Sequence, residues 1–569
     1  MIDFKKKIIE ILEEKIPDLS AKEIELLIEI PPSYDLGDFA FPVFSLAKVY
    51  RKNPAIIAQD LAKEIKDDNF EKIETKGPYI NFFINKEKLI STVLNEIAEK
   101  KEDFGKSTMG NGKNVLIEYS SPNIAKPFHI GHIRSTVIGD SIKRIYKFLG
   151  YNTIALNHLG DYGTQFGMLI CAYKHWGDKE KIEKNPIPEL LKLYVRINAE
   201  AEENEDLRNE SRKYFKLLEE NDQEAMEIWE WFREVSLKEF SRVYKMLDIE
   251  FDSYNGESFY TDKMPAIVEE LKEKNLLEDS QGAKIVNLEK EGLPPSIIIK
   301  SDGTTIYLTR DLAAAKYRKD TYKFYKNLYV VGSQQNLHFN QLRAILQKMG
   351  YDWAKDCIHI PFGMVSLEDG TLSTRKGKVV YLEDLLNKAV DKVESILEDR
   401  EKLKGQAIEN KRELAHIVGI GAVKFQELFN QRIKDYVFNW DKSLSFEGET
   451  GPYVQYTHAR IASLLEKGQF DINKKIDVFL IESDEEINLI RILYNFTKAV
   501  IDAHDKYEPY IVSRYLIELA KTFNKYYTNT QILIEDEELK NARLFLCYGV
   551  KTVLKEGLNL LGIKSPDKM

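Results

Sequence analysis

A strand–helix–strand pattern between residues 115 and 157 constrains the fold more than any other feature of the sequence. An apolar run at 115–119 (VLIEY) is followed by a helical pattern at about 132–149 and by a second apolar run at 153–157 (TIALN). Strands joined through a helix pair in parallel with a right-handed crossover, and ligands of such sheets bind at the strands' carboxyl ends. The pattern therefore predicts a Rossmann-type parallel sheet whose functional residues follow its strands.

The rest of the chain divides around this unit, because 569 residues exceed the ~100–200 usual for one domain. Residues 1–110 mix helical stretches with a strand-like run and end in a glycine-rich linker, so we expect an α+β N-terminal domain. We expect the parallel-sheet domain at 111–380, with a helical insertion at about 180–250 and further strands at 304–309, 328–331 and 358–360. A connecting helical segment at 381–450 then leads to an all-α bundle at 451–569.

Composition excludes several classes of protein. Hydrophobic residues make up 43% of the chain and charged residues 31%, which suits a folded protein with a well-solvated surface. Charges at the start and the lack of ~18 consecutive apolar residues argue against a signal peptide and a membrane span, so we expect a cytoplasmic protein. The formal charge of −10 predicts that a nucleic-acid partner would need local basic patches. Cys171, Cys357 and Cys547 lie far apart, which predicts buried thiols and no cysteine zinc site.

The most informative stretch is 120–132 (SSPNIAKPFHIGH), between the first strand and the helix. A helix N-terminus after a parallel strand presents unpaired N–H groups and the positive end of the helix dipole, which favour bound phosphate. His129 and His132 could donate hydrogen bonds to oxygens that gain charge when a phosphoryl group is attacked, and Gly131 would leave room for a nucleotide. The stretch therefore favours nucleotidyl transfer.

A histidine pair on a helix can also be core packing or a metal site. A zinc site needs three or four ligands, and none of the other histidines among the nine lies near these two in sequence. We therefore expect no resident metal. The chain also lacks a G-x-x-x-x-G-K-[ST] loop and a G-x-G-x-x-G fingerprint, which removes the usual support for P-loop hydrolysis and dinucleotide redox chemistry.

On these residues the sequence resembles the class I aminoacyl-tRNA synthetases, whose HIGH signature matches 129–132, and among them the arginyl-tRNA synthetases. Four further blocks follow in the family's order: 158–167 (HLGDYGTQFG), 307–313 (YLTRDLA), 331–338 (VGSQQNLH) and 453–460 (YVQYTHAR). The resemblance covers nearly the whole chain. It implies a multidomain α/β fold, with a class I Rossmann-type catalytic domain, an N-terminal domain that contacts the tRNA elbow and an anticodon-binding helical bundle.

The resemblance also implies how ATP is bound. The family's KMSKS loop matches 371–377 (TLSTRKG), but Thr371 and Thr374 replace both lysines. In arginyl members a lysine just before HIGH substitutes for the second lysine, and Lys126 occupies that place. The implied ATP-binding residues are Lys126, His129, Gly131, His132, His338, Ser373, Arg375 and Lys376. Of these, Lys126, His129, Gly131 and His132 would be catalytic, with ATP carried as its Mg²⁺ complex.

An arginine pocket needs acidic and other acceptor groups, because a guanidinium is planar, permanently charged and carries five donors. Two residues also have a structural reading: Asp311 could cap a helix that begins at Leu312, and Tyr307 could be core. By resemblance, the residues that hold the guanidinium are Glu118, Tyr307 and Asp311, and those that hold the α-amino and carboxylate groups are Ser121, Asn123 and Gln335.

The implied activity is that of an arginine–tRNA ligase. The arginine carboxylate attacks the α-phosphorus of ATP, giving arginyl-adenylate and pyrophosphate, and the terminal 2′-OH of tRNA(Arg) then takes the arginyl group. In the bundle, Lys521, Lys525, Tyr526 and Tyr527 are candidates to contact anticodon bases. We expect a monomer whose partners are tRNA(Arg), L-arginine and ATP, with no DNA or membrane partner. Two alternatives remain: a small-molecule adenylyltransferase with an HxGH site, and a catalytically silent tRNA-binding paralogue.

Overall fold

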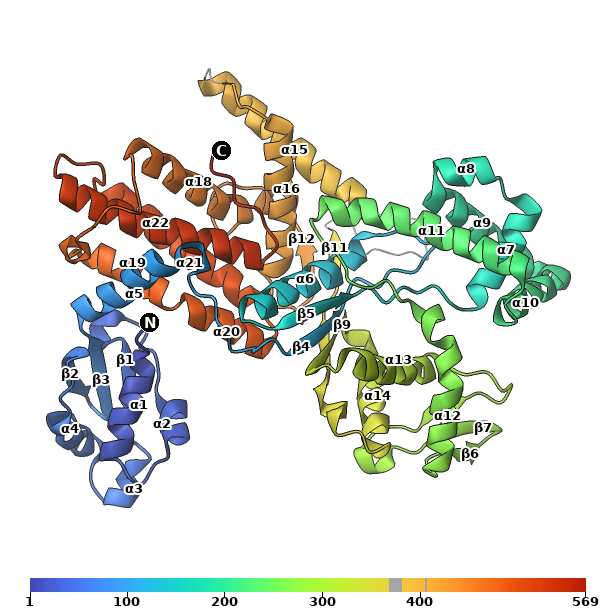
Figure 1. The fold of residues 1–569 in the computed structure, drawn as a ribbon, viewed down its shortest axis with the longest axis horizontal. Coiled ribbons are helices and arrows are strands. Elements are labelled where there is room, and N and C mark those ends of the chain that lie inside the picture. Colours follow the sequence, from blue (N-terminus) through green and yellow to red (C-terminus); the bar gives the residue numbers. More distant parts are fainter. Residues whose placement is uncertain (368–380, 405–406) are drawn as a thin grey trace.

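The computed structural model describes residues 1–367, 381–404 and 407–569. A parallel sheet lies at the centre, between a C-terminal helical bundle on one side and a group of helices from the middle of the chain on the other (Figure 1). The N-terminal residues form a separate α+β unit next to the bundle (Figure 1). This arrangement confirms the expected fold class.

The central sheet has four parallel strands in the order β10-β9-β4-β5. The strands are β4 (Asn114–Glu118), β5 (Asn152–Leu156), β9 (Lys326–Gly332) and β10 (Cys357–Phe362). Helix α6 (Ile133–Phe148) joins β4 to β5, which confirms the predicted strand–helix–strand unit. Residues 115–118 of β4 are buried, as expected for a strand covered on both faces. The segments that follow these strands gather at one edge of the sheet.

Five helices that follow β5 form the group on the right of Figure 1. Acidic residues at the start of α10 suit a helix N-terminus, where Asn204 accepts hydrogen bonds from the N–H groups of Asp206 and Leu207. The helices are α7 (Thr164–Trp176), α8 (Lys179–Lys184), α9 (Pro186–Glu203), α10 (Glu205–Glu219) and α11 (Gln223–Met246).

Residues 304–309 do not form the strand that the sequence predicts. Helix α13 (Tyr307–Tyr322) begins inside this segment, because Leu308, Leu312 and Ala315 follow helical spacing and are buried on one face. The N-cap is Ile306, so Asp311 lies in the second turn of the helix. The reading of Asp311 as a helix cap is therefore wrong.

A small antiparallel sheet precedes α13 and was not expected from the sequence. Its strands are β6 (Glu278–Ser280), β7 (Ala283–Val286) and β8 (Ser296–Ile299), in the order β6-β7-β8. Helices α12 (Met264–Glu273) and α14 (Asn336–Lys348) complete this part of the molecule. It shares a second hydrophobic core with one face of the central sheet, to which Leu116 and Leu156 contribute.

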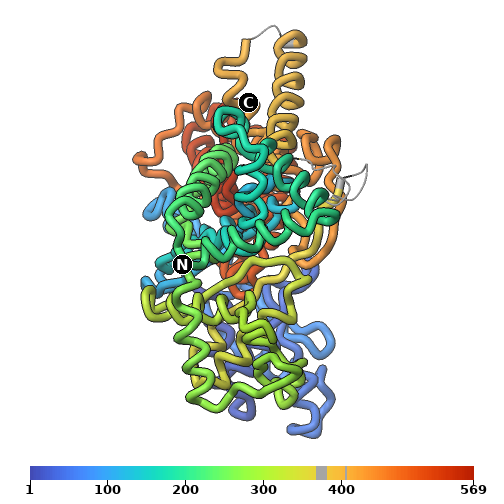
Figure 2. The backbone as a smooth tube through the Cα atoms, turned by 90° about the vertical axis from the view of Figure 1, so that its right-hand side faces the viewer, coloured from blue at the N-terminus to red at the C-terminus, as the bar shows by residue number. Residues whose placement is uncertain are grey.

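Beyond the sheet the chain is almost entirely helical. Helices α15 (Leu382–Lys404) and α16 (Lys411–Leu428) lie side by side and project from the body of the molecule (Figure 2). Strand β11 (Val365–Leu367) pairs in parallel with β12 (Tyr436–Phe438), which links the sheet region to this segment. The remaining helices are α17 (Trp440–Ser443), α18 (Gly451–Lys467), α19 (Asp484–Tyr494), α20 (Phe496–Lys506), α21 (Tyr510–Asn529) and α22 (Glu537–Leu560).

The N-terminal unit packs directly on this bundle. Helix α5 contacts α19, the N–H of Phe4 donates to the Tyr494 hydroxyl (3.0 Å), and Arg491 pairs with Asp38 (2.7 Å). Its helices are α1 (Phe4–Lys15), α2 (Ala21–Leu27), α3 (Leu46–Tyr50), α4 (Pro54–Glu64) and α5 (Lys86–Lys100). Its antiparallel strands are β1 (Phe39–Pro42), β2 (Phe70–Lys76) and β3 (Tyr79–Ile84), in the order β1-β3-β2. None of the helices in the described part of the chain is long and apolar enough to cross a membrane.

Candidate active site

The loop that joins β4 to α6 has an unusual backbone. Ser120, Ser121 and Ala125 have φ values of 70°, 48° and 58°, a region that residues other than glycine rarely adopt. The N–H of Ser120 donates to the hydroxyl of Ser135 in α6 (2.9 Å), which in turn donates to a β9 carbonyl (2.7 Å). The N–H of Ala125 donates to Ser236 in α11 (2.9 Å). The loop is thus held in a strained shape by both flanking layers, as functional loops often are.

The two histidines of the signature stack on each other at the start of α6. Their ring centroids lie 4.1 Å apart. The N–H of Gly131 donates to Nδ1 of His129 (3.1 Å), so the neutral His129 ring carries its proton on Nε2. Nδ1 of His132 lies 3.2 Å from the His129 backbone nitrogen, which fixes the second ring. A Cβ atom at Gly131 would lie 2.8 Å from Cε1 of His129, so this glycine makes room for the imidazole itself.

Both rings are neutral at physiological pH. Burial lowers the pKa of His132 to about 3, with a smaller contribution from the neighbouring His129. Burial also lowers the pKa of His129. Neutral imidazoles at a helix N-terminus act as hydrogen-bond donors to a phosphate, and they need not lose a proton to do so.

A chain of charged and polar groups connects the two acidic residues of the predicted arginine pocket. Glu118 ends β4 and pairs with Arg318 of α13, with 2.6 Å between Oε2 and Nη2. Nη2 of Arg318 lies 3.4 Å from Nδ1 of His158. Nε2 of His158 lies 3.8 Å from Asp311, whose other carboxylate oxygen is 2.6 Å from Nε2 of His338. The structure therefore brings both acidic residues into one cluster at the carboxyl edge of the sheet.

The pKa values of Asp311 and His338 are both shifted by their contact. Burial opposes ionisation of Asp311, but the hydrogen bond and charge of His338 outweigh it and leave the pKa of Asp311 lowered. Burial likewise opposes the charge on His338, and the same hydrogen bond leaves the pKa of His338 raised. Asp311 is thus a carboxylate at physiological pH. His338, which the resemblance assigns to ATP, contacts Asp311 in this structure.

The other predicted pocket residues lie on α13 and on the segments that follow β4 and β9. Tyr307 lies one helical turn before Asp311 and is 60% exposed. Gln335 is exposed and ends a 3-10 turn at the start of α14, one turn before His338. Ser121 is half-buried and Asn123 is exposed, both in the strained loop. Asn123 forms a parallel bridge with Gly160, whose Cβ position is filled by the Asn123 side chain.

Lys126 lies in the strained loop, and its ammonium contacts an aromatic ring of the helical insertion. It is half-buried, and its Nζ lies over the ring of Tyr194 in α9, 5.4 Å from the ring centroid. The structure therefore places this predicted catalytic residue against the helical insertion.

The second signature, with Ser373, Arg375 and Lys376, lies outside the described residues, but both of its flanks are described. Before it, β11 pairs with β12, and the buried Arg134 of α6 donates to the carbonyls of Lys434 (2.8 Å) and Arg432 (3.1 Å) next to β12. After it, Tyr381 forms an antiparallel bridge with His129. Both described flanks of this segment therefore lie close to the histidine pair.

Three residues at or beside the site were not predicted: His158, Arg318 and Arg134. His158 begins the family block at 158–167, directly after the second apolar run, so its position at the strand ends could have been predicted. Arg318 and Arg134 are 1% and 0% exposed, and nothing in the sequence marks a buried arginine. Their partners lie far away in sequence.

Family models match three parts of the chain. Residues 92–440 match the family model "tRNA synthetases class I (R), catalytic domain". Residues 3–84 match "Arginyl tRNA synthetase N terminal domain", and residues 454–569 match "DALR anticodon binding domain".

Full-length relatives and solved structures point to the same family. The chain is 58% identical to an arginine–tRNA ligase of Halothermothrix orenii, with all of both chains covered. It superposes on the arginyl-tRNA synthetase of Plasmodium falciparum with a TM-score of 0.82 and 27% identity, covering 100% of this chain and 99% of the other. For the arginyl-tRNA synthetase of Thermus thermophilus, the TM-score is 0.84 and the identity 25%, with the same coverage.

Proposed function

Because the chain belongs to the arginyl-tRNA synthetase family, we propose a division of roles among the residues at the carboxyl edge of its parallel sheet. The chain is an arginine–tRNA ligase, which uses ATP to activate L-arginine and joins it to tRNA. The alternatives of a small-molecule adenylyltransferase and a silent paralogue are not supported. The roles of single residues rest on the geometry described above.

His129 and His132 are proposed to bind the α-phosphate of ATP. Their neutral rings stack at the N-terminus of α6, where the helix dipole also favours negative charge. As the arginine carboxylate attacks, the phosphate oxygens gain charge, and hydrogen bonds from the rings stabilise them. Gly131 allows the His129 ring to take its position.

The remaining ATP contacts neutralise the leaving pyrophosphate. Lys126 would leave the ring of Tyr194 and turn toward the phosphates, which its flexible side chain permits. Ser373, Arg375 and Lys376, outside the described residues, are proposed to contribute from the neighbouring segment, with Mg²⁺ bound to the phosphates.

Asp311 is proposed to be the main guanidinium ligand. The charge of Glu118 is already balanced by Arg318 at 2.6 Å, so this pair adds little net charge to the pocket. Among the described residues, the ion pairs of Asp311 are with histidines, and when His338 is neutral the negative charge of Asp311 is available to a guanidinium. Tyr307 would contact the guanidinium next to Asp311. Glu118 would then accept one further donor while Arg318 fixes its orientation.

The arginine's α-amino and carboxylate groups are proposed to bind Ser121, Asn123 and Gln335, on the side of the histidine pair. The activated arginyl group then passes to the terminal 2′-OH of tRNA(Arg). Residues 451–569 would bind the anticodon and residues 1–110 the tRNA elbow, with 111–380 as the catalytic domain and 381–450 as the connection. The enzyme is proposed to act as a monomer in the cytoplasm.

The observation that carries the amino-acid assignment is the cluster of Glu118, Arg318, His158, Asp311 and His338 beside the HIGH signature. ATP–pyrophosphate exchange with each of the twenty amino acids, with and without bulk tRNA, tests it. We expect exchange with arginine alone and only when tRNA is present. Exchange supported equally by lysine would contradict the proposed pocket, because an ammonium cannot reproduce the planar fork of a guanidinium.

A further inference from the structure

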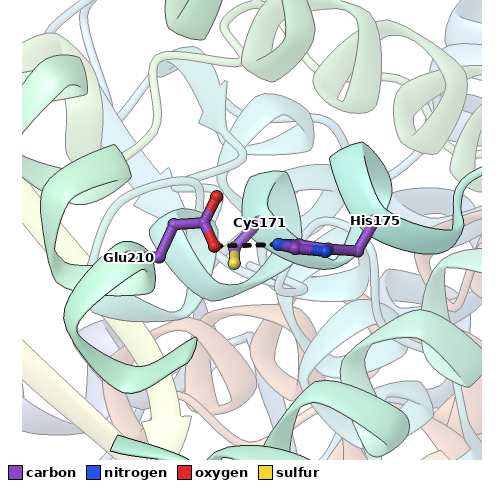
Figure 3. Close-up of side chains that lie close together, drawn as sticks. All are labelled: Cys171, His175 and Glu210. Atoms are coloured by element: carbon purple, nitrogen blue, oxygen red, sulfur yellow. Dashed lines mark hydrogen bonds and ion pairs between the residues drawn. The ribbon is translucent and has the colours of Figure 1, made fainter. Parts of the chain in front are cut away.

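A group of potential metal ligands lies in the helical insertion, away from the active site. Cys171 and His175 lie one turn apart on α7, and Glu210 faces them from α10 (Figure 3). One ligand atom from each residue lies within 4.8 Å of the other two. Nε2 of His175 is 2.8 Å from Oε2 of Glu210. Three different kinds of ligand thus converge from two helices.

The packing of α7 against α10 brings these groups together. Gly167 lies one turn before Cys171, and a Cβ atom there would be 2.4 Å from the carbonyl oxygen of Ser211. Only a glycine permits such a close approach of the two helices. The same face of α7 then carries Gly167, Cys171 and His175 in succession, so the close contact continues into the ligand group.

A buried hydroxyl next to the group has no hydrogen-bond partner among the described residues. Ser211 follows Glu210 in α10, is 3% exposed, and its Oγ is unsatisfied. A buried polar atom without a partner costs stability, and a bound ion with its water is one way to satisfy it.

We propose that Cys171, His175 and Glu210 bind one zinc ion. A thiolate, an imidazole and a carboxylate together suit Zn²⁺, whereas Mg²⁺ and Ca²⁺ prefer oxygen ligands only. Bond lengths of about 2.0–2.3 Å in a tetrahedral site require ligand atoms about 3.3–3.6 Å apart. The three ligand atoms, which lie within 4.8 Å of one another, would adjust to this spacing, and water would complete the fourth position. The thiol proton is released as the sulfur–zinc bond forms.

The proposed ion would link α7 to α10. Helix α7 begins at Thr164, directly after the segment 158–163. In this segment, Asp161 accepts a hydrogen bond from the N–H of Ser258 (2.8 Å), and Gly160 forms a bridge with Asn123 of the active-site loop. The ion would therefore stabilise the layer that supports this loop, without taking part in the reaction. Binding to the folded chain alone raises its thermal stability.

The competing explanation is a surface His175–Glu210 ion pair beside an ordinary buried thiol. Side chains of His175 and Glu210 are 40% and 36% exposed, and such pairs contribute little to stability. The two explanations differ in one respect: only a metal site needs Cys171. The decisive test is therefore whether the sulfur of Cys171 binds the metal.

The experiment uses the purified full-length chain, stripped of metal with a chelator and titrated with Zn²⁺ against a chromophoric zinc indicator. In parallel, Co²⁺ replaces Zn²⁺, since a thiolate–cobalt bond gives a charge-transfer band in the near ultraviolet. We expect one zinc ion per chain, the thiolate band with cobalt, and a rise in melting temperature of a few degrees on adding zinc.

Variants separate the ligands from their surroundings. Cys171→Ala should remove the cobalt charge-transfer band, and the exposed His175→Gln should weaken zinc binding by at least tenfold without a folding defect. The matched control is Glu224→Gln, which breaks the adjacent Lys174–Glu224 ion pair and should leave zinc affinity unchanged. Zinc binding that survives Cys171→Ala and His175→Gln at full affinity, or no saturable binding to the wild-type chain, would overturn the proposal.

Discussion

Replacing Asp311 by asparagine removes the negative charge that we assign to guanidinium recognition and keeps the size of the side chain. The amide oxygen can still accept the hydrogen bond from His338, now 2.6 Å from the carboxylate, so the helix and the cluster should stay folded. Removing one partner of a desolvated, hydrogen-bonded charge pair costs about 2–5 kcal/mol. The Asp311 side chain is 27% exposed, which favours the lower part of that range.

A loss of about 2–3 kcal/mol corresponds to a fall of about 30- to 160-fold in kcat/KM for arginine, since about 1.36 kcal/mol is a factor of ten. Steady-state aminoacylation with arginine and ATP varied separately measures it, and the KM for ATP should change by less than about threefold. Asp320→Asn, on an exposed position of the same helix, is the matched control and should behave as wild type. An unchanged arginine KM, or an equal rise in both constants, would remove Asp311 from the pocket.

Three further predictions concern the histidines and the glycine of the site. His132→Ala should slow arginyl-adenylate formation by about two orders of magnitude, which is the scale for one lost transition-state donor. Affinity for tRNA, measured by filter binding, should stay near wild type. An equal fall in tRNA affinity would contradict the proposed role of His132. Gly131→Ala should lower kcat with little change in the arginine KM, because the added Cβ would lie 2.8 Å from Cε1 of His129 and displace that ring; wild-type kcat would show that the ring position is unimportant. The arginine KM should rise as pH falls through the raised pKa of His338, because a protonated His338 cancels the charge of Asp311 that arginine needs. A pH profile of kcat/KM measures this effect. His132 cannot contribute to it, because its pKa is about 3. An unchanged pH dependence of kcat/KM in His338→Gln would refute the assignment.

Local patterns were sufficient to predict the central unit of the fold. The runs at 115–119 and 153–157 are short, apolar and separated by a helical pattern, and the structure pairs them in parallel. The prediction of a strand at 304–309 is wrong. The threonine, isoleucine and tyrosine side chains of this segment favour strands. In the structure, the helix that begins here buries Leu308 and Leu312 in the second core. Strands β6 and β7 were missed because they have three and four residues, which is too short for an apolar alternation to be detected.

For the site, the sequence predicted candidate residues but not their partners. The signature histidines and Asp311 could be predicted because family blocks mark them. The Glu118–Arg318 pair joins residues of different elements, and the contact of Arg318 with His158 spans 160 positions, so both depend on the tertiary fold. In the bundle, Tyr526 was a candidate for anticodon contact, but it is fully buried and its hydroxyl bonds to Glu486. Tyr527, at 39% exposed, stays a candidate.

The central claim is that arginine and ATP meet at the carboxyl edge of the parallel sheet, with the guanidinium on Asp311 and the α-phosphate on the histidine pair. A crystal structure of the enzyme with a non-hydrolysable arginyl-adenylate analogue measures this directly. We expect a guanidinium nitrogen within about 3 Å of a carboxylate oxygen of Asp311 and the phosphate within hydrogen-bond distance of His129 or His132. A guanidinium bound elsewhere, with Asp311 still paired only to its histidines, would contradict the account.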